Sequence, residues 1–219
     1  LLMTSDVLGG HSSLAACFMN NGHSPISYTL RRLKPSANTQ PILLGNFAGA
    51  ALDDIINQAD YHPHNTIRNS FREQALQFCT CADFNPQQFK EDVLRQVENI
   101  KEAVKSLTPN PSPSERGVQE LLEPSFVCEH LGLQGRVDLM TSDKRLLVEQ
   151  KSGKNWNLEH SAGLSTQASH LYAESHYVQL LLYYGILRYN FHLPADKVDI
   201  RLLYSRYPAK QGLLVVNYY

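Results

Sequence analysis

Hydrophobic and polar positions in the first half of the chain repeat with the period of an α-helix. Apolar residues spaced three and four positions apart predict helices, which we expect over 12–20, 27–33, 42–58, 66–78 and 87–106. The last of these has a continuous apolar stripe along one face, as expected for a helix that packs on a core. A stretch rich in proline and serine, 108–117, follows and indicates an exposed loop. The first half of the chain is therefore predicted to be helical.

The second half combines short apolar runs with one long apolar segment. The short runs are typical of strands, which we expect over 123–129, 133–140, 145–150, 197–205 and 212–217. The long segment predicts a helix over 176–189, and 152–175, which has little periodicity, is expected to be a mobile loop. Helices, a strand meander, a further helix and closing strands predict an α/β fold with a central mixed β-sheet flanked by helices.

Three charged residues interrupt the apolar runs that are predicted to pair as a hairpin. Asp138 ends the first run, and Glu149 and Lys151 lie two positions apart in the second. Side chains at i and i+2 of a strand project from the same face, and turn-forming residues at 141–144 would bring Asp138 alongside Glu149. Two carboxylates and one ammonium group can hold Mg²⁺ or Mn²⁺ and stabilise charge on a phosphodiester. The alternative is an exposed hairpin with ordinary surface charges, although charge is costly in strands this apolar.

The sequence around these charges resembles the PD-(D/E)XK nuclease superfamily. Gly135-Arg-Val-Asp138, Glu149-Gln-Lys151 and the Ser-Gly pair that follows are similar to the motifs of its RecB-like branch. The resemblance implies a restriction-endonuclease-like core and a metal-dependent deoxyribonuclease. It also implies that Asp138, Glu149 and the backbone carbonyl of Gln150 hold Mg²⁺ or Mn²⁺. Lys151 would then orient or deprotonate the attacking water and stabilise the phosphate.

A second group of candidate residues lies in the predicted helix at 176–189. Gln179 and Tyr183 are four positions apart and therefore share one helix face. RecB-like nucleases carry a Q-x-x-x-Y motif at this place, beside the metal site and the DNA, which implies that both residues position the substrate. The alternative is a core helix whose Gln and Tyr find local hydrogen bonds. Further candidates for contact with phosphate are Arg136, Lys154 and Arg188.

One motif of the family is incomplete in this chain. Gly45-Asn-Phe-Ala-Gly49-Ala-Ala-Leu-Asp53 matches the frame of the motif, but Gly49 stands where a metal-binding histidine is expected. Related enzymes place an acid at the start of the strand before Gly135, so Glu123 is expected to substitute as a metal ligand. The alternative role of Glu123 is that of an exposed acid at a strand start. His62 and His64 could also fold back towards the metal, although nothing in the sequence requires it.

The cysteines and the other histidines show weaker patterns. Relatives in the RecB-like branch that hold a [4Fe–4S] cluster have one cysteine before the catalytic core and three after it. This chain has Cys17, Cys79, Cys81 and Cys128, and no cysteine after the last of these. The resemblance therefore implies no iron–sulfur cluster within this chain, and free thiols are expected. His160, His170 and His176 are interpreted as polar loop residues rather than as metal ligands.

The composition is typical of a globular protein and does not by itself indicate binding to nucleic acid. The chain has 219 residues, of which 42% are hydrophobic, and a net charge of −1. These values are typical of a globular chain, and we expect one domain over 1–219. The near-zero charge excludes a global basic signature, so contact with DNA must come from a local patch. Neither a membrane span nor a signal peptide is expected, which favours a cytoplasmic protein.

The resemblance extends over residues 40–219, with 1–40 as a helical extension and 123–219 as the catalytic core. The chain begins at Leu1 rather than at methionine, which indicates a domain cut from a longer polypeptide. The most similar pattern is that of the nuclease domains of replication and repair helicase-nucleases. We therefore expect an exonuclease or endonuclease that acts on single-stranded DNA or DNA ends beside a superfamily 1 helicase module. The alternatives are a non-catalytic DNA-binding or scaffolding module on a degenerate nuclease fold and a hydrolase of another phosphodiester.

Overall fold

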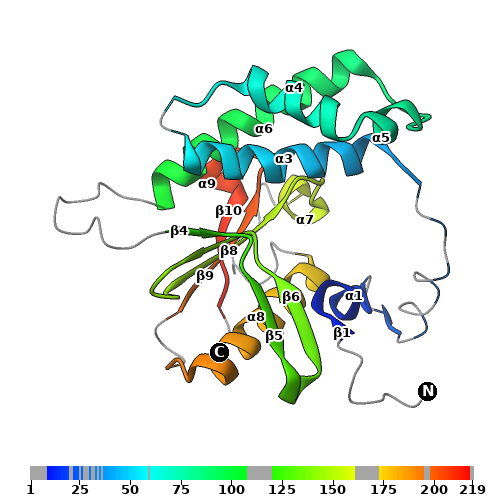
Figure 1. The fold of residues 1–219 in the computed structure, drawn as a ribbon. Coiled ribbons are helices and arrows are strands. Elements are labelled where there is room, and N and C mark those ends of the chain that lie inside the picture. Colours follow the sequence, from blue (N-terminus) through cyan, green and yellow to red (C-terminus); the bar gives the residue numbers. More distant parts are fainter. Residues whose placement is uncertain are drawn as a thin grey trace.

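The structure of the chain is a computed structural model (Figure 1). It describes residues 9–19, 22–24, 26, 30, 33, 35, 37–58, 60–107, 120–160, 173–194 and 198–217. The predicted loop at 108–117 and most of the predicted helix at 27–33 lie outside the described residues. Within the described part of the chain, no helix is both long enough and apolar enough to cross a membrane.

A five-stranded sheet carries the predicted charged hairpin. Its strands are arranged in the order β10 (Leu213–Val215), β9 (Asp199–Tyr204), β8 (Leu146–Lys151), β7 (Leu139–Thr141) and β4 (Glu120–Leu122). Strands β8 and β9 are parallel, whereas the other neighbours in this sheet are antiparallel. The β7–β8 turn includes Lys144, whose φ is +59°. The chain therefore has a mixed α/β fold with a central mixed sheet, and the predicted pairing of the charged hairpin is confirmed.

The strand predicted over 133–140 is divided into β6 and β7, and the strand predicted over 123–129 is shorter and begins only at Ser125. Strands β5 (Ser125–Cys128) and β6 (Leu133–Arg136), joined by a 3₁₀ turn (Glu129–Leu131), leave the main sheet and form a three-stranded sheet with β1 (Gly9–Gly10). Pro124 has no N–H and Glu123 has a φ of +47°, so a regular strand cannot continue there. The Glu123 N–H still donates to the Asp138 carbonyl at 3.0 Å across the break. Asp138 therefore lies at a corner where the hairpin passes from one sheet to the other.

One side of the main sheet is covered by helices α3 (Gln40–Asn57), α4 (Pro63–Glu73), α5 (Ala75–Cys79) and α6 (Pro86–Leu107) (Figure 1). Helices α3 and α6 agree closely with the prediction because their apolar stripes share one core, which includes Phe47 and Val97. The helix predicted over 66–78 is two helices, because the backbone leaves helical geometry at Gln74 (φ −112°, ψ 27°). Ala103 of α6 then packs with Val148 of β8, which joins the helical layer to the sheet.

Helix α8 (Glu174–Phe191) covers the opposite side of the sheet (Figure 1). It contains the helix predicted over 176–189. Leu180 and Leu187 of α8 are completely buried in one core with Leu147 and Leu202 of the sheet. The sheet therefore separates two helical layers, so alternate side chains along β8 face different helices.

The remaining described elements are short: α1 (His11–Ala15), β2 (Phe18–Met19), β3 (Gly22–His23), α7 (Trp156–His160) and α9 (Ala209–Gly212). The helix predicted over 12–20 is only α1, because the chain enters β2 at Phe18. The loop predicted over 152–175 is wrong at its beginning, where Asn155 Oδ1 accepts hydrogen bonds from the Asn157 and Leu158 N–H groups and starts α7. Residues 161–172 of this segment lie outside the described residues.

Candidate active site

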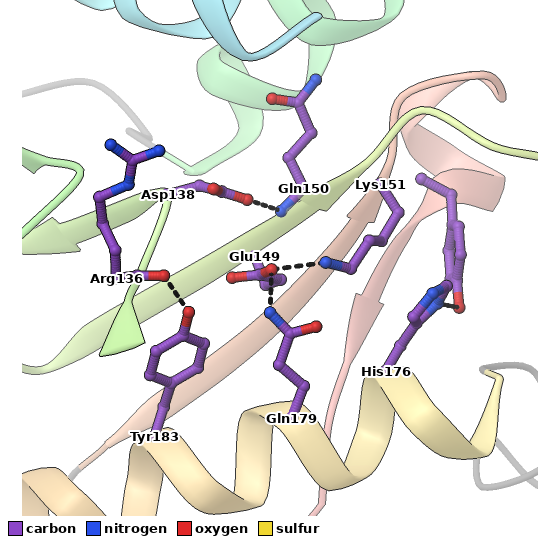
Figure 2. Close-up of polar contacts among 9 residues, drawn as sticks. Arg136, Asp138, Glu149, Gln150, Lys151, His176, Gln179 and Tyr183 are labelled. Carbon is purple, nitrogen blue, oxygen red and sulfur yellow. Dashed lines mark hydrogen bonds and ion pairs between the residues drawn. The ribbon is translucent and has the colours of Figure 1, made fainter. Parts of the chain in front are cut away.

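Asp138, Glu149 and Lys151 converge at the end of β8, as the sequence predicts (Figure 2). Glu149 and Lys151 project from the same face of β8, and Lys151 Nζ lies 2.6 Å from Glu149 Oε1. Asp138 reaches β8 from the corner between the two sheets, and its Oδ2 accepts a hydrogen bond from the Gln150 N–H at 2.6 Å. The hairpin therefore brings two carboxylates and one ammonium group to one place.

Gln179 and Tyr183 approach this group from α8 (Figure 2). Gln179 Nε2 donates to Glu149 Oε1 at 2.5 Å, and the Tyr183 hydroxyl donates to the backbone carbonyl of Arg136. Both side chains are buried, with exposed fractions of 6% and 1%. They contact the residues that form the site and lie behind them. This geometry is compatible with both interpretations of Gln179 and Tyr183. They can be residues of a core helix with local hydrogen bonds, or residues that position a substrate.

The electrostatics of Glu149 are unusual for a carboxylate in a sheet. Its side chain is 4% exposed, Oε1 is bonded to Lys151 and Gln179, and Oε2 has no hydrogen-bond partner. The pKa of Glu149 is raised to about 7, chiefly by burial and also by the negative charge of Asp138, while Lys151 and Gln179 oppose the rise. Burial likewise raises the pKa of Asp138, while the Gln150 N–H and Lys151 oppose it. A buried carboxylate with an orphaned oxygen and a half-buried one that repels it fit a hard divalent cation with oxygen ligands.

A pocket of about 420 Å³ opens beside these residues. Its wall is formed by α3, the corner of the hairpin, the segment after β8 and the start of α8; the lining residues are Gly45, Ala48, Gly49, Asp138, Gln150, Lys151, Ser152, Gly153, Lys154 and His176. Glu149 is buried and is not among them, so Asp138 is the lining residue that presents a carboxylate to the pocket. A Cβ atom added at Gly49 would meet nothing within 4 Å. The pocket thus contains free space beside Gly49.

Glu123 and Arg136 form an ion pair at the rim of the site. Arg136 Nη1 lies 2.9 Å from Glu123 Oε2, and both side chains are exposed to solvent. The pKa of Asp53 of α3 is raised to about 6, chiefly by burial and also by the negative charges of Glu123 and Asp138. Within the described ranges, however, no three His, Cys, Asp or Glu side chains are close enough together to hold a metal ion. Glu123 therefore has Arg136 as its partner, and its expected role as a ligand stays a prediction.

The side chain of Gln150 faces the opposite helical layer and anchors β8 there, as its strand position predicts. Its Nε2 donates to the Ala48 carbonyl of α3 at 3.2 Å and to Ser205 Oγ at 3.1 Å. Ser205 Oγ donates in turn to Gln96 Oε1, and Gln96 Nε2 donates to the Ser152 carbonyl at 3.0 Å. This buried network fixes α3 and α6 against both ends of the Glu149–Ser152 segment.

His176 is not the loop residue that the sequence suggested, because it lies in the first turn of α8 and lines the pocket. The Tyr204 hydroxyl accepts hydrogen bonds from the Ala173 N–H at 3.1 Å and from the Asn155 side chain. Its own proton is therefore directed to His176 Nδ1, 2.8 Å away. The pKa of His176 is lowered to about 4, chiefly by burial and also by the nearby Lys151 charge. At neutral pH the imidazole is thus uncharged and carries its proton on Nε2.

The other sequence candidates lie in different surroundings. Lys154 lines the pocket, whereas Arg188 lies over the Tyr184 ring at 5.8 Å and is not a lining residue. His62 and His64 lie at the start of α4 and do not line the pocket either. His170 and the side chain of His160 lie outside the described residues. Gln96 and Ser205 were not predicted, because single polar residues within apolar segments give no pattern that distinguishes a buried network from solvent-exposed positions.

Replacing Glu149 by Gln should stabilise the metal-free protein at alkaline pH. The pKa of Glu149 is raised from 4.5 to about 7, so the folded state holds this proton more tightly than the unfolded chain. The wild-type protein therefore loses stability as pH rises through this window, whereas Glu149→Gln has no proton there to lose. In EDTA, the Tm of the variant relative to wild type should increase by a few °C between about pH 5 and about pH 8.

The matched control is Glu98→Gln, which replaces an exposed glutamate on α6 and measures the general effect of removing a carboxylate. A difference for Glu149→Gln that stays constant across this range would show that the Glu149 carboxylate is not held in an unfavourable environment.

Comparison with known proteins adds no further constraint on this site. No family model matches the chain. No curated protein matches it significantly either. What the site can do must therefore be inferred from the side chains that the fold brings together.

Proposed function

We propose that this chain is a metal-dependent deoxyribonuclease domain with a restriction-endonuclease-like core. It would hydrolyse phosphodiester bonds in single-stranded DNA or at DNA ends. The observation that carries the proposal is the buried carboxylate of Glu149, which meets Asp138 and Lys151 beside an open pocket and keeps one oxygen without a hydrogen bond. An arrangement that leaves buried charge uncompensated is costly to stability, and such groups are concentrated at functional sites.

Asp138, Glu149 Oε2 and the backbone carbonyl of Gln150 would hold Mg²⁺ or Mn²⁺ together with water. When bound, the ion would polarise the phosphate and lower the pKa of a water molecule. The chain itself supplies oxygen ligands, which these hard cations prefer, and separates them from bulk solvent. The ion pair between Lys151 and Glu149 uses only Oε1, so Oε2 is available without breaking it.

Lys151 and His176 would act on the phosphate from the pocket wall. The Lys151 ammonium group, held by Glu149, would stabilise negative charge that develops on the phosphate and orient the attacking water. The uncharged His176 would donate its Nε2–H to a phosphate oxygen, because Tyr204 occupies Nδ1. Gln179 and Tyr183 would position Glu149 and the Arg136 backbone, and Lys154 would contact a neighbouring phosphate.

The wider context of this activity follows from the same proposal. A nuclease that cuts single strands or ends requires that DNA be unwound, which a superfamily 1 helicase module in the same chain or in a partner chain would do. We place the protein in DNA replication or repair, in the cytoplasm. No cofactor other than the divalent cation is required by this chemistry.

One observation favours a second function, a non-catalytic DNA-binding or scaffolding module on a degenerate nuclease fold. Gly49 contributes no ligand, and the described residues contain no group of three metal-binding side chains. A module of this kind would bind DNA through Lys154 and Arg136 and would not depend on Mn²⁺. The two functions therefore predict different results for DNA cleavage and for Mn²⁺ binding.

Lys151→Ala should abolish cleavage of labelled single-stranded DNA in Mg²⁺ or Mn²⁺, with a loss of about a hundred-fold or more, because the charge that stabilises the transition state is removed. The same variant should still bind Mn²⁺ in a calorimetric titration, since its carboxylate ligands remain. Asp138→Ala should lose both cleavage and Mn²⁺ binding. Lys105→Ala, a change of an exposed lysine on α6, is the matched control and should retain both.

A Lys151→Ala variant that cleaves at the wild-type rate would refute the catalytic assignment. DNA binding by a wild-type protein that neither cleaves DNA nor binds Mn²⁺ would identify the non-catalytic module instead.

Two substitutions of His176 should distinguish the contributions of its two ring nitrogens to DNA binding. Glutamine places an amide nitrogen near the position of Nε2, whereas asparagine keeps only the contact that Nδ1 makes with Tyr204. We expect His176→Gln to retain most of the affinity for single-stranded DNA and His176→Asn to lose several-fold, measured by fluorescence anisotropy with Ca²⁺ in place of Mg²⁺.

Because the donor is uncharged, neither substitution should change the slope of log Kd against log salt. Lys154→Ala should reduce this slope by about 0.7, the contribution of one phosphate contact on a single strand. A reduced slope for His176→Asn would show that His176 binds as a cation, contrary to the proposal.

A further inference from the structure

His176 lines the pocket, and its contact with Tyr204 through Nδ1 leaves Nε2 as the ring nitrogen available to a ligand there. The position of the imidazole proton decides what such a ligand meets. With the proton on Nε2, the ring donates a hydrogen bond, which suits a phosphate oxygen. With the proton on Nδ1, it presents a lone pair that repels such an oxygen. The group that selects the tautomer therefore determines whether His176 can bind phosphate.

The side chain of Asn155 has a fixed orientation at the start of α7. It is 4% exposed, and its Oδ1 accepts hydrogen bonds from the Asn157 N–H at 2.9 Å and from the Leu158 N–H at 3.3 Å. The same side chain is hydrogen-bonded to the Tyr204 hydroxyl. Because both lone pairs of Oδ1 are occupied by backbone donors, the atom that reaches Tyr204 is Nδ2, which can only donate.

The backbone of Asn155 is held from the other side of the segment. Its N–H donates to the Tyr207 hydroxyl at 2.8 Å, and that hydroxyl donates to Glu159 Oε1 at 3.0 Å. Gln211 Nε2 donates to the Leu158 carbonyl at 3.2 Å and so fixes the helix that Asn155 caps. The amide group of Asn155 therefore cannot turn over without the loss of this cap.

We propose that Asn155 is a positioning residue of the site, which fixes the direction of the hydrogen bond between Tyr204 and His176 and thereby keeps the histidine proton on Nε2. The Ala173 N–H and Asn155 Nδ2 use both lone pairs of the Tyr204 oxygen, so the hydroxyl proton is left for His176 Nδ1, 2.8 Å away. Without the Asn155 donor, one lone pair would be free to accept from an Nδ1–H. This inference rests on the proposed nuclease function and adds to it how the phosphate-binding tautomer is selected.

The tautomer is measured directly by NMR of protein labelled with ¹⁵N-histidine, without metal and without DNA. The unprotonated nitrogen of a neutral imidazole resonates far downfield of the protonated one. The His176 signals are identified among the nine histidines by their loss in His176→Gln. At neutral pH we expect Nδ1 of His176 to be the downfield nitrogen in the wild-type protein. A downfield Nε2, or shifts averaged between two tautomers, would overturn the inference without recourse to any variant.

Two substitutions of Asn155 remove the donor and keep an oxygen that can cap α7. In Asn155→Asp, the second carboxylate oxygen accepts from the Tyr204 hydroxyl, so Tyr204 should accept from His176 and the proton should move to Nδ1. In Asn155→Ser, the shorter side chain has no group to donate to Tyr204, and both tautomers should be populated. A change in either variant supports the inference, whereas the wild-type tautomer in both would overturn it. Asn65→Asp adds the same charge at an exposed position of α4 and should leave the His176 signals unchanged.

Affinity for single-stranded DNA in Ca²⁺ then connects the tautomer with the substrate. Asn155→Asp should weaken binding several-fold in the wild-type background and little further in a His176→Asn background, because the effect passes through His176. An equal loss in both backgrounds would show that the aspartate acts through its own charge, which contradicts the inference. If wild-type protein binds no DNA, the proposed function fails, whereas the NMR measurement decides the role of Asn155 independently.

Discussion

The burial of one carboxylate, that of Glu149, is the constraint on which the rest of the site depends. Its place inside a sheet follows from the apolar residues that precede it in β8, Leu147 and Val148, and there its charge loses the hydration that water would provide. Lys151 and Gln179 compensate one oxygen, whereas the other has no partner. Helix α8 is held against the hairpin by two residues of one face. Gln179 bonds Glu149, and Tyr183 bonds the backbone carbonyl of Arg136. A stable core and an unsatisfied charge therefore occupy the same strand.

Asp138 reaches Glu149 only because the hairpin changes direction. The break at Glu123 and Pro124 frees Asp138 from the alternation of a regular strand and turns its carboxylate to the Gln150 N–H. On the other face, the Gln150 side chain is bonded to α3 and to Ser205. The main chain of Gln150 thus contacts Asp138, and its side chain contacts helix α3, so this residue connects the two. This arrangement keeps the two carboxylates close together despite their mutual repulsion, a geometry that a divalent cation would stabilise further.

Helices and strand faces could be predicted from the sequence where apolar or charged residues repeat at a regular spacing. Contacts between single residues that are distant in the chain could not. The apolar stripes of α3, α6 and α8 predict helices, and the i, i+2 spacing of Glu149 and Lys151 predicts their shared face. The break between β6 and β7 was not predicted, because residues 133–140 form one continuous run with the apolar pattern of a strand. The role of His176 depends on Tyr204, which is distant in the chain and becomes a neighbour only in the folded structure.

The most direct test of the central claim, that Asp138 and Glu149 form a divalent metal site, is anomalous diffraction from crystals of the wild-type protein soaked in Mn²⁺. We predict an anomalous peak within coordination distance of Asp138 and Glu149 Oε2, with the Gln150 carbonyl completing the set of protein ligands. Diffraction that shows no peak between these carboxylates, with Lys151 still paired to Glu149 and manganese bound only elsewhere, would contradict the account.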